Sequence, residues 1–130
     1  MNDDEPTYTV DEARALLPQV RATLLQLAIE RLGADASHDE LHRRLRHDGN
    51  GSPDDLSRLE AATEELRARV RDLLDHLESL GVVVRDLDAG LVDIPTVRDG
   101  EPVWLCWRLA DPELAFWHTT REGFSTRRPL

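Results

Sequence analysis

The sequence predicts an α+β protein, with a long antiparallel helical hairpin over residues 9–81 followed by a small antiparallel β-meander of three to four strands and a tail over residues 82–130. Two observations predict this class. Apolar residues recur at helical spacing through the first part of the chain, and after Gly81 the apolar period shortens to two. A length of 130 residues is that of one ordinary domain, so we expect a single domain over residues 1–130.

The first helix is predicted to begin at a capping box formed by Thr9 and Glu12, in which each side chain bonds the other residue's backbone amide. Pro18 is expected to bend this helix without ending it. One helical face carries Ala13, Leu17, Val20, Leu24 and Leu27, and we expect Leu16, Leu25, Ala28 and Leu32 to widen that apolar stripe.

The segment 33–53 has the weakest pattern. Residues 37–47 have helical composition, and the glycine-rich segment 48–53 is predicted to be a loop. A basic cluster over residues 42–47 is flanked by acidic residues, so we interpret it as a solvated helix face.

The second helix has the clearest pattern in the chain. Ser52 can cap it, Pro53 suits its first position, and Gly81 suits the left-handed conformation that ends a helix. Steps of three and four residues predict a coiled-coil seam of Leu56, Leu59, Thr63, Leu66, Val70, Leu73, Leu77 and Leu80. Its partner is expected to be the first helix, with a second copy of the chain as the alternative.

The remainder reads as strands over residues 82–87, 90–95, 103–108 and 115–119. Residues 88–90 are predicted to form the first turn, and Asp99-Gly100 is a typical hairpin turn.

Composition excludes several classes of function. A net charge of −10 disfavours nucleic-acid binding, since such a chain repels phosphates. One cysteine cannot form an internal disulfide, the acidic N-terminus is unlike a secretory signal, and no apolar run approaches the roughly 20 residues of a membrane helix. We therefore expect a cytoplasmic protein without membrane or nucleic-acid partners.

Residues 103–118 raise the question of chemistry, because they hold all three tryptophans and the only cysteine. Strand alternation places Cys106 with Trp104 and away from Leu105. A hairpin through residues 110–113 would bring His118 alongside, and the preceding strand carries Asp93. Cys106 and His118 are then either plain core residues, a nucleophile pair, or ligands of a metal such as zinc or iron. The pair His38 and His42 is better explained as solvated.

Several motifs in the second half resemble the bacterial domain-of-unknown-function family 2203. TVDEARALLP resembles the family's opening, GLVDIP its GLVDFP, and LCW and WH recur unchanged, with a GxxxR pattern near the end. The resemblance covers nearly the whole chain. Asp111 lies in Ala110-Asp111, where the family usually has Gly-Glu. The resemblance implies that Asp93, Cys106, Asp111, His118 and Arg127 converge in one pocket. We expect Trp104, Trp107 and Trp117 to form its walls.

Three functions follow from these patterns, in order of preference. The first is a ligand- or metal-binding module, with Cys106 and His118 as metal ligands. The second is an interaction protein that works through its helical seam, and the third is an enzyme with a Cys106 thiolate. Surplus apolar surface predicts a homodimer or higher homo-oligomer. Nothing in the sequence identifies a ligand or reaction.

Overall fold

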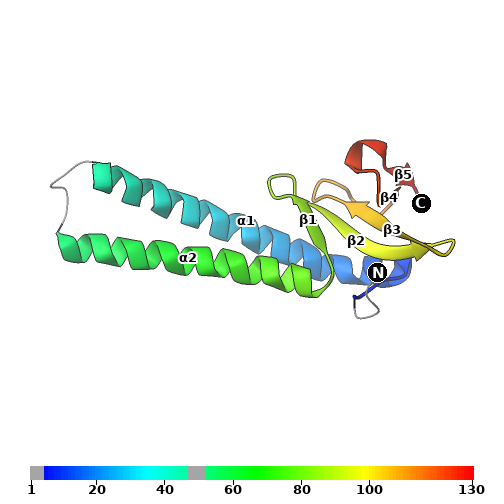
Figure 1. Cartoon of the computed structure of the whole chain (residues 1–130), viewed down its shortest axis with the longest axis horizontal. Coiled ribbons are helices and arrows are strands. Elements are labelled where there is room, and N and C mark those ends of the chain that lie inside the picture. Colours follow the sequence, from blue (N-terminus) through cyan, green and yellow to red (C-terminus); the bar gives the residue numbers. More distant parts are fainter. Residues whose placement is uncertain (1–4, 47–51) are drawn as a thin grey trace. The chain divides into compact units, whose positions relative to one another are not determined.

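The computed structural model describes residues 5–46 and 52–130, so most of the predicted loop over residues 48–53 lies outside the described residues. The described elements are helices α1 (Val10–Arg46) and α2 (Pro53–Ser79), strands β1 (Val83–Asp86), β2 (Leu91–Arg98), β3 (Glu101–Trp107), β4 (Phe116–Thr119) and β5 (Arg128–Pro129), and the 3-10 helix η1 (Phe124–Thr126) (Figure 1). The α+β class is confirmed. None of the described helices is long and apolar enough to span a membrane.

The helix ends form as their sequences predict. The amide of Thr9 donates to the Glu12 carboxylate at 2.9 Å, and the amide of Glu12 donates to the Thr9 hydroxyl at 3.1 Å. The Ser52 hydroxyl accepts from the amide of Asp55 at 3.1 Å at the start of α2. Gly81 has a φ of 77° directly after that helix, a conformation that glycine adopts at little cost.

Helix α1 is longer than its pattern indicated, because it continues through Pro18 and Gly33 to Arg46 without a break. The expected widening of its apolar stripe is wrong for Leu25, Ala28 and Leu32, which are exposed. At about 100° per residue these positions turn away from the buried stripe through Val20, Leu24 and Leu27.

The described residues divide into two compact units. The helical unit, residues 25–75, contains the second half of α1 and nearly all of α2. In this unit Ser37 and Thr63 hydroxyls lie 2.5 Å apart, Arg67 contacts His38 at 2.6 Å, and Arg69 lies 3.9 Å from Glu30. Glu30 meets Arg69, whereas Ser37, further along α1, meets the earlier α2 residue Thr63, so the two segments run antiparallel. Every predicted seam position of α2 in this unit is half-buried or buried.

The sheet unit comprises residues 5–24 and 76–130 of the described chain. Its five strands form one antiparallel sheet in the order β1-β2-β3-β4-β5. The fifth strand, beyond the three to four expected, is two residues long and leaves no periodic signal in the sequence. Asp99 and Gly100 have φ values of 52° and 81° between β2 and β3, which confirms the predicted hairpin turn.

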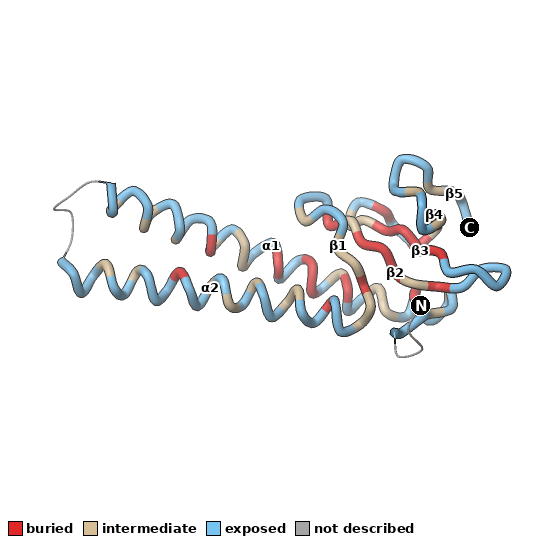
Figure 2. Tube along the Cα trace, in the orientation of Figure 1, coloured by how far each residue is buried: buried red, intermediate tan, exposed pale blue. Residues whose placement is uncertain are grey.

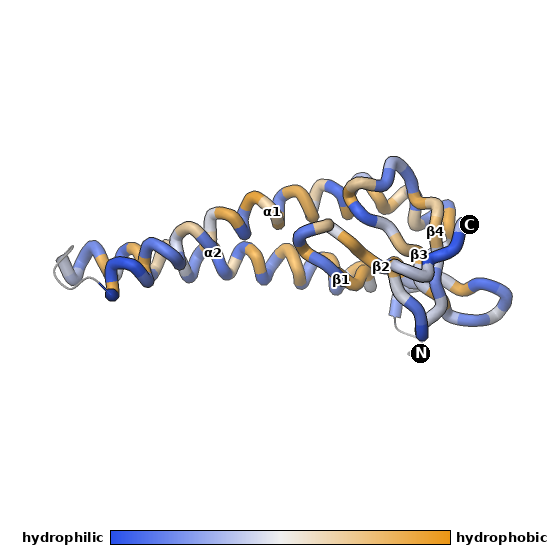
Figure 3. The backbone as a smooth tube through the Cα atoms, turned by 90° about the horizontal axis from the view of Figure 1, so that it is seen from above, coloured by the Kyte–Doolittle hydropathy of each residue, from blue (hydrophilic) through white to orange (hydrophobic). Residues whose placement is uncertain are grey.

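One face of the sheet forms the core of this unit. It carries Val92, Ile94, Leu105 and Trp107, none more than 1% exposed. The first half of α1 lies against this face, with the Arg21 guanidinium 4.9 Å from the Trp107 ring centroid. Buried residues concentrate in β2, β3 and this part of α1 (Figure 2), while apolar residues recur at intervals along both helices (Figure 3).

Candidate metal site on the sheet

Three adjacent strands bring Asp93, Cys106 and His118 together on the face of the sheet opposite the core. These three residues are called the trio below. Asp93 is the register partner of Cys106, and Trp104, two residues before Cys106, is the partner of His118. Because partners share a face and side chains alternate, all three point the same way. Their potential ligand atoms all lie within 4.8 Å of one another, and each residue is no more than 2% exposed.

His118 is held at both ring nitrogens. Nε2 lies 2.9 Å from Oδ1 of Asp93, and Nδ1 lies 2.8 Å from the backbone oxygen of Thr119. The carbonyl oxygen can only accept, so Nδ1 carries a proton. The hydrogen bond between Nε2 and Oδ1 also needs one proton, carried either by the imidazole or by the carboxyl group. One proton therefore sits between His118 and Asp93.

Asp93 is also held by Arg85, whose Nε donates to its second carboxylate oxygen at 2.8 Å. The register between β1 and β2 shifts between Val84 and Asp86, which leaves Arg85 as the extra residue of a bulge. Val83 is the register partner of Asp93, so alternation along β1 directs Arg85 to the face that carries Asp93. Sequence analysis did not identify Arg85, because its contact with Asp93 depends on the pairing of β1 with β2, which local spacing does not encode.

Cys106 is a free thiol, 1% exposed. Burial, together with the nearby Asp93 carboxylate, raises the pKa of Cys106 to about 11, although Arg127 beside it acts in the opposite direction. The thiol is therefore protonated near neutral pH. Among the described residues no hydrogen bond joins Cys106 to His118, whose two ring nitrogens are bonded to Asp93 and Thr119.

Asp111 and Arg127 form a second cluster next to the trio. Two guanidinium nitrogens of Arg127 donate to Asp111 at 2.7 and 3.3 Å, and the backbone amide of Arg108 donates to the same carboxylate at 3.2 Å. Burial alone would raise the pKa of Asp111, but these hydrogen bonds outweigh it and hold that pKa below its usual value. The guanidinium carbon of Arg127 lies 4.0 Å from the ring centroid of Phe116 and 4.3 Å from that of Phe124. Asp111 thus pairs with arginines and is not in the trio.

The trio opens into a pocket of about 310 Å³, whose other lining residues are Arg85, Leu91, Thr120, Glu122, Gly123 and Phe124. Glu122 accepts from Thr119 and pairs with Arg128 at 3.2 Å. The residues after β4 therefore form part of the pocket wall, a role that nothing in their composition indicated.

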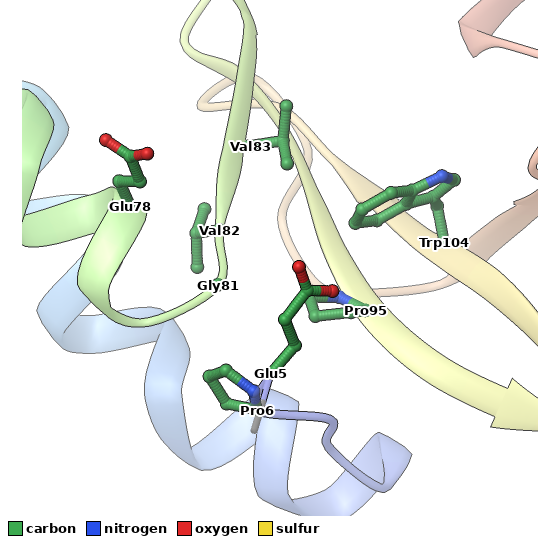
Figure 4. A pocket seen from close by; sticks show the side chains of 8 residues that line it. All are labelled: Glu5, Pro6, Glu78, Gly81, Val82, Val83, Pro95 and Trp104. Carbon is green, nitrogen blue, oxygen red and sulfur yellow. The ribbon is translucent and has the colours of Figure 1, made fainter. Parts of the chain in front are cut away.

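The tryptophans do not line this pocket. Trp107 and Trp117 lie on the opposite face of the sheet, and the buried indole nitrogen of Trp107 has no hydrogen-bond partner among the described residues. Trp104 shares the face of the trio but lines a separate pocket of about 350 Å³. Figure 4 shows this second pocket, lined by Glu5, Pro6, Glu78, Gly81, Val82, Val83, Pro95 and Trp104.

The fold and the trio define the class: an α+β protein in which a meander carries a buried Asp-Cys-His candidate metal site. The chain belongs to the DUF2203 family of uncharacterized conserved proteins, whose profile matches residues 6–130. No curated protein and no solved structure matches it.

Proposed function

We propose that this protein is a metal-binding protein that holds one transition-metal ion, zinc in the first place, on Asp93, Cys106 and His118. The observation that carries the proposal is the convergence of carboxylate, thiol and imidazole, all buried, within 4.8 Å. This donor set suits zinc, and iron is the alternative. Ligand atoms around tetrahedral zinc are separated by roughly 3–4 Å, so small side-chain rotations would close the trio around an ion.

The partners of the trio support this proposal. A metal-bound histidine commonly donates its other ring N–H to a carbonyl, as His118 does to Thr119, and a ligating carboxylate is itself hydrogen-bonded, as Asp93 is by Arg85. An ion would take the place of the proton between His118 and Asp93. Three protein ligands leave one coordination position open, which is typical of sites that bind a further ligand or substrate.

The raised pKa of Cys106 favours a metal ligand over a free nucleophile. A thiol that titrates at about 11 is almost entirely protonated at neutral pH, and Asp93 beside it opposes ionisation. A bound cation would reverse this electrostatic penalty and displace the proton. Metal affinity should therefore increase with pH, by about tenfold per pH unit for each proton released.

The test is metal analysis of protein purified without a nickel column, followed by titration of metal-free protein with cobalt(II). We expect about one ion per chain and a cobalt–thiolate charge-transfer band in the near ultraviolet. Cys106→Ser should abolish that band, and Asp93→Asn and His118→Gln should weaken binding by at least about tenfold.

The matched control is the double variant His38→Gln/His42→Gln, which removes a stacked histidine pair from the helical unit. It should bind cobalt as the unmodified protein does. Folded protein that neither contains nor takes up zinc, iron or cobalt would refute the proposal and leave the trio as a structural hydrogen-bonded cluster.

A second candidate function is self-association through α1. Leu25, Ile29 and Leu32 are 50%, 62% and 73% exposed and follow one another at steps of four and three residues. Ala36 extends this row by one more step of four residues. The four positions carry no charged side chain, although 32% of the residues in the chain are charged. A partner must offer an equally uncharged helix face, and a second copy of the same face supplies one.

Sedimentation of the purified chain tests this candidate. We expect a dimer at micromolar concentration that Ile29→Glu converts to a monomer, whereas Ala61→Glu, on an exposed position of α2, leaves it dimeric. A monomeric wild-type chain would eliminate self-association as a function.

A further inference from the structure

Arg85 lines the pocket beside the trio, and only part of its guanidinium group is bonded to another side chain. Arg85 uses Nε to bond Asp93, and its terminal nitrogens have no hydrogen-bond partner among the described residues. Its side chain is 46% exposed, so the guanidinium reaches from the buried carboxylate toward solvent. The guanidinium also lies 5.3 Å from the Trp104 ring centroid, which restricts its orientation.

Glu122, another charged residue that lines the pocket, is balanced by Arg128. In the neighbouring cluster Asp111 pairs with both Arg127 and Arg108, so no negative charge is left over there. A divalent ion on the trio would be neutralised by the Asp93 carboxylate and the Cys106 thiolate. With His118 neutral as a ligand, Arg85 would then leave the pocket with one net positive charge, although the whole chain carries −10. A local positive charge in a concave site attracts anions.

We propose that the pocket binds a small oxyanion, a carboxylate or phosphate, with one oxygen in the open coordination position and another on the terminal nitrogens of Arg85. This inference rests on the proposed metal site and names the class of ligand that the site takes. A planar guanidinium donates two parallel hydrogen bonds to such anions, which an ammonium group cannot do. A pocket of about 310 Å³ has room for an anion of this size.

Arg85 then has two roles along one side chain. Nε orients the Asp93 ligand, and the terminal nitrogens bind the anion. Val83 is the register partner of Asp93, so alternation along β1 directs Arg85, two residues further on, to the same face, and the bulge leaves Arg85 without a register partner in β2.

The experiment uses the full-length chain loaded with cobalt(II) and titrated with acetate or inorganic phosphate at constant ionic strength. We expect a saturable change in the visible cobalt bands with at least one of the two anions, and none with acetamide, the neutral analogue of acetate. Acetate and phosphate thereby distinguish a carboxylate ligand from a phosphate ligand.

The variant Arg85→Met should weaken anion binding at least tenfold while the cobalt–thiolate band persists at saturating cobalt. Arg85→Lys keeps the positive charge but lacks the planar pair of donors. Its anion affinity should therefore lie between those of the wild type and Arg85→Met. The matched control is Arg98→Met, because Arg98 is also stacked on a tryptophan of the sheet, at 4.6 Å from Trp117, but does not line the pocket.

The outcomes separate the two proposals. A cobalt–thiolate band that neither acetate nor phosphate perturbs overturns the anion site alone. Wild-type anion affinity in both folded Arg85 variants also overturns it. A chain that never acquires the band overturns the metal site, and the anion site with it.

Discussion

The sheet unit and the helical unit bury their residues to very different extents. Among described residues 25–75, only Leu27, Ala34 and Thr63 are buried, and Leu25, Ile29, Leu32 and Leu45 are at least half exposed. The sheet unit, by contrast, has a continuous buried core on one face and a buried polar trio on the other. The contrast is visible in the burial colours of Figure 2.

The difference has a geometric cause. Two helices share one seam, so most of each helix surface faces solvent, whereas a sheet covered on both faces buries alternate residues on each side. In the described part of the chain, the buried cluster of polar side chains therefore lies in the sheet unit. The helical unit retains apolar surface that is suited to a partner.

The largest expected effect comes from placing charges in the helical seam. Leu66→Asp/Leu73→Asp should destabilise the chain by more than about 3 kcal/mol, because each carboxylate replaces an apolar contact at a half-buried position. Far-ultraviolet circular dichroism during thermal unfolding measures the helices, and tryptophan fluorescence measures the sheet unit, which holds all three tryptophans.

Its control is Ala61→Asp/Ala62→Asp, which adds the same charges at exposed positions of α2 and should cost less than about 1 kcal/mol. Cooperative melting of the seam variant at the wild-type temperature would contradict the pairing of the two helices. Loss of helix signal with unchanged fluorescence would show that the sheet unit folds alone.

Two glycines should respond in opposite directions to replacement by alanine. Gly90 has a φ of 61°, and an added Cβ would lie 2.5 Å from the Leu109 side chain, so Gly90→Ala should destabilise by about 1–3 kcal/mol. Gly33 lies inside α1, and its Cβ would meet Leu66 at 3.7 Å, so Gly33→Ala should stabilise by about 0.5–1 kcal/mol. Denaturant unfolding of both variants measures the difference, and the same sign for both would refute this account.

A further effect concerns pH in metal-free protein. The pKa of Cys106 is raised from 9.0 to about 11 in the folded chain, so as pH increases through this range the unfolded chain loses its thiol proton first. Stability attributable to the thiol is therefore complete below pH 9.0 and is lost as pH rises toward about 11, by at most about 3 kcal/mol.

The matched comparison for this pH effect is Cys106→Ser, which lacks a titrating thiol. Tyr8, whose pKa is also raised, by burial and by Glu12, contributes equally to both proteins and cancels in the difference. Urea unfolding of the two proteins from pH 8 to 11 measures it. Parallel pH curves would show that Cys106 does not titrate as a buried thiol.

The sequence by itself determined the elements whose signals are local. Thr9 with Glu12, Ser52, Gly81 and Asp99-Gly100 each specify a cap or turn within a few residues. The seam of α2 and the alternation of β3 follow from periodicity alone, so the α+β class and the face of Cys106 were predictable.

Only the tertiary structure decided which of the predicted pocket residues meet. Register places His118 with Cys106 and Asp93, and a slip of one residue would have turned it to the other face. Pairing of β1 with β2 also brought Arg85 to Asp93, and the folded chain matched Asp111 with Arg127 and placed Trp107 and Trp117 on the face opposite the trio. These arrangements depend on contacts between distant residues, which composition and local spacing do not encode.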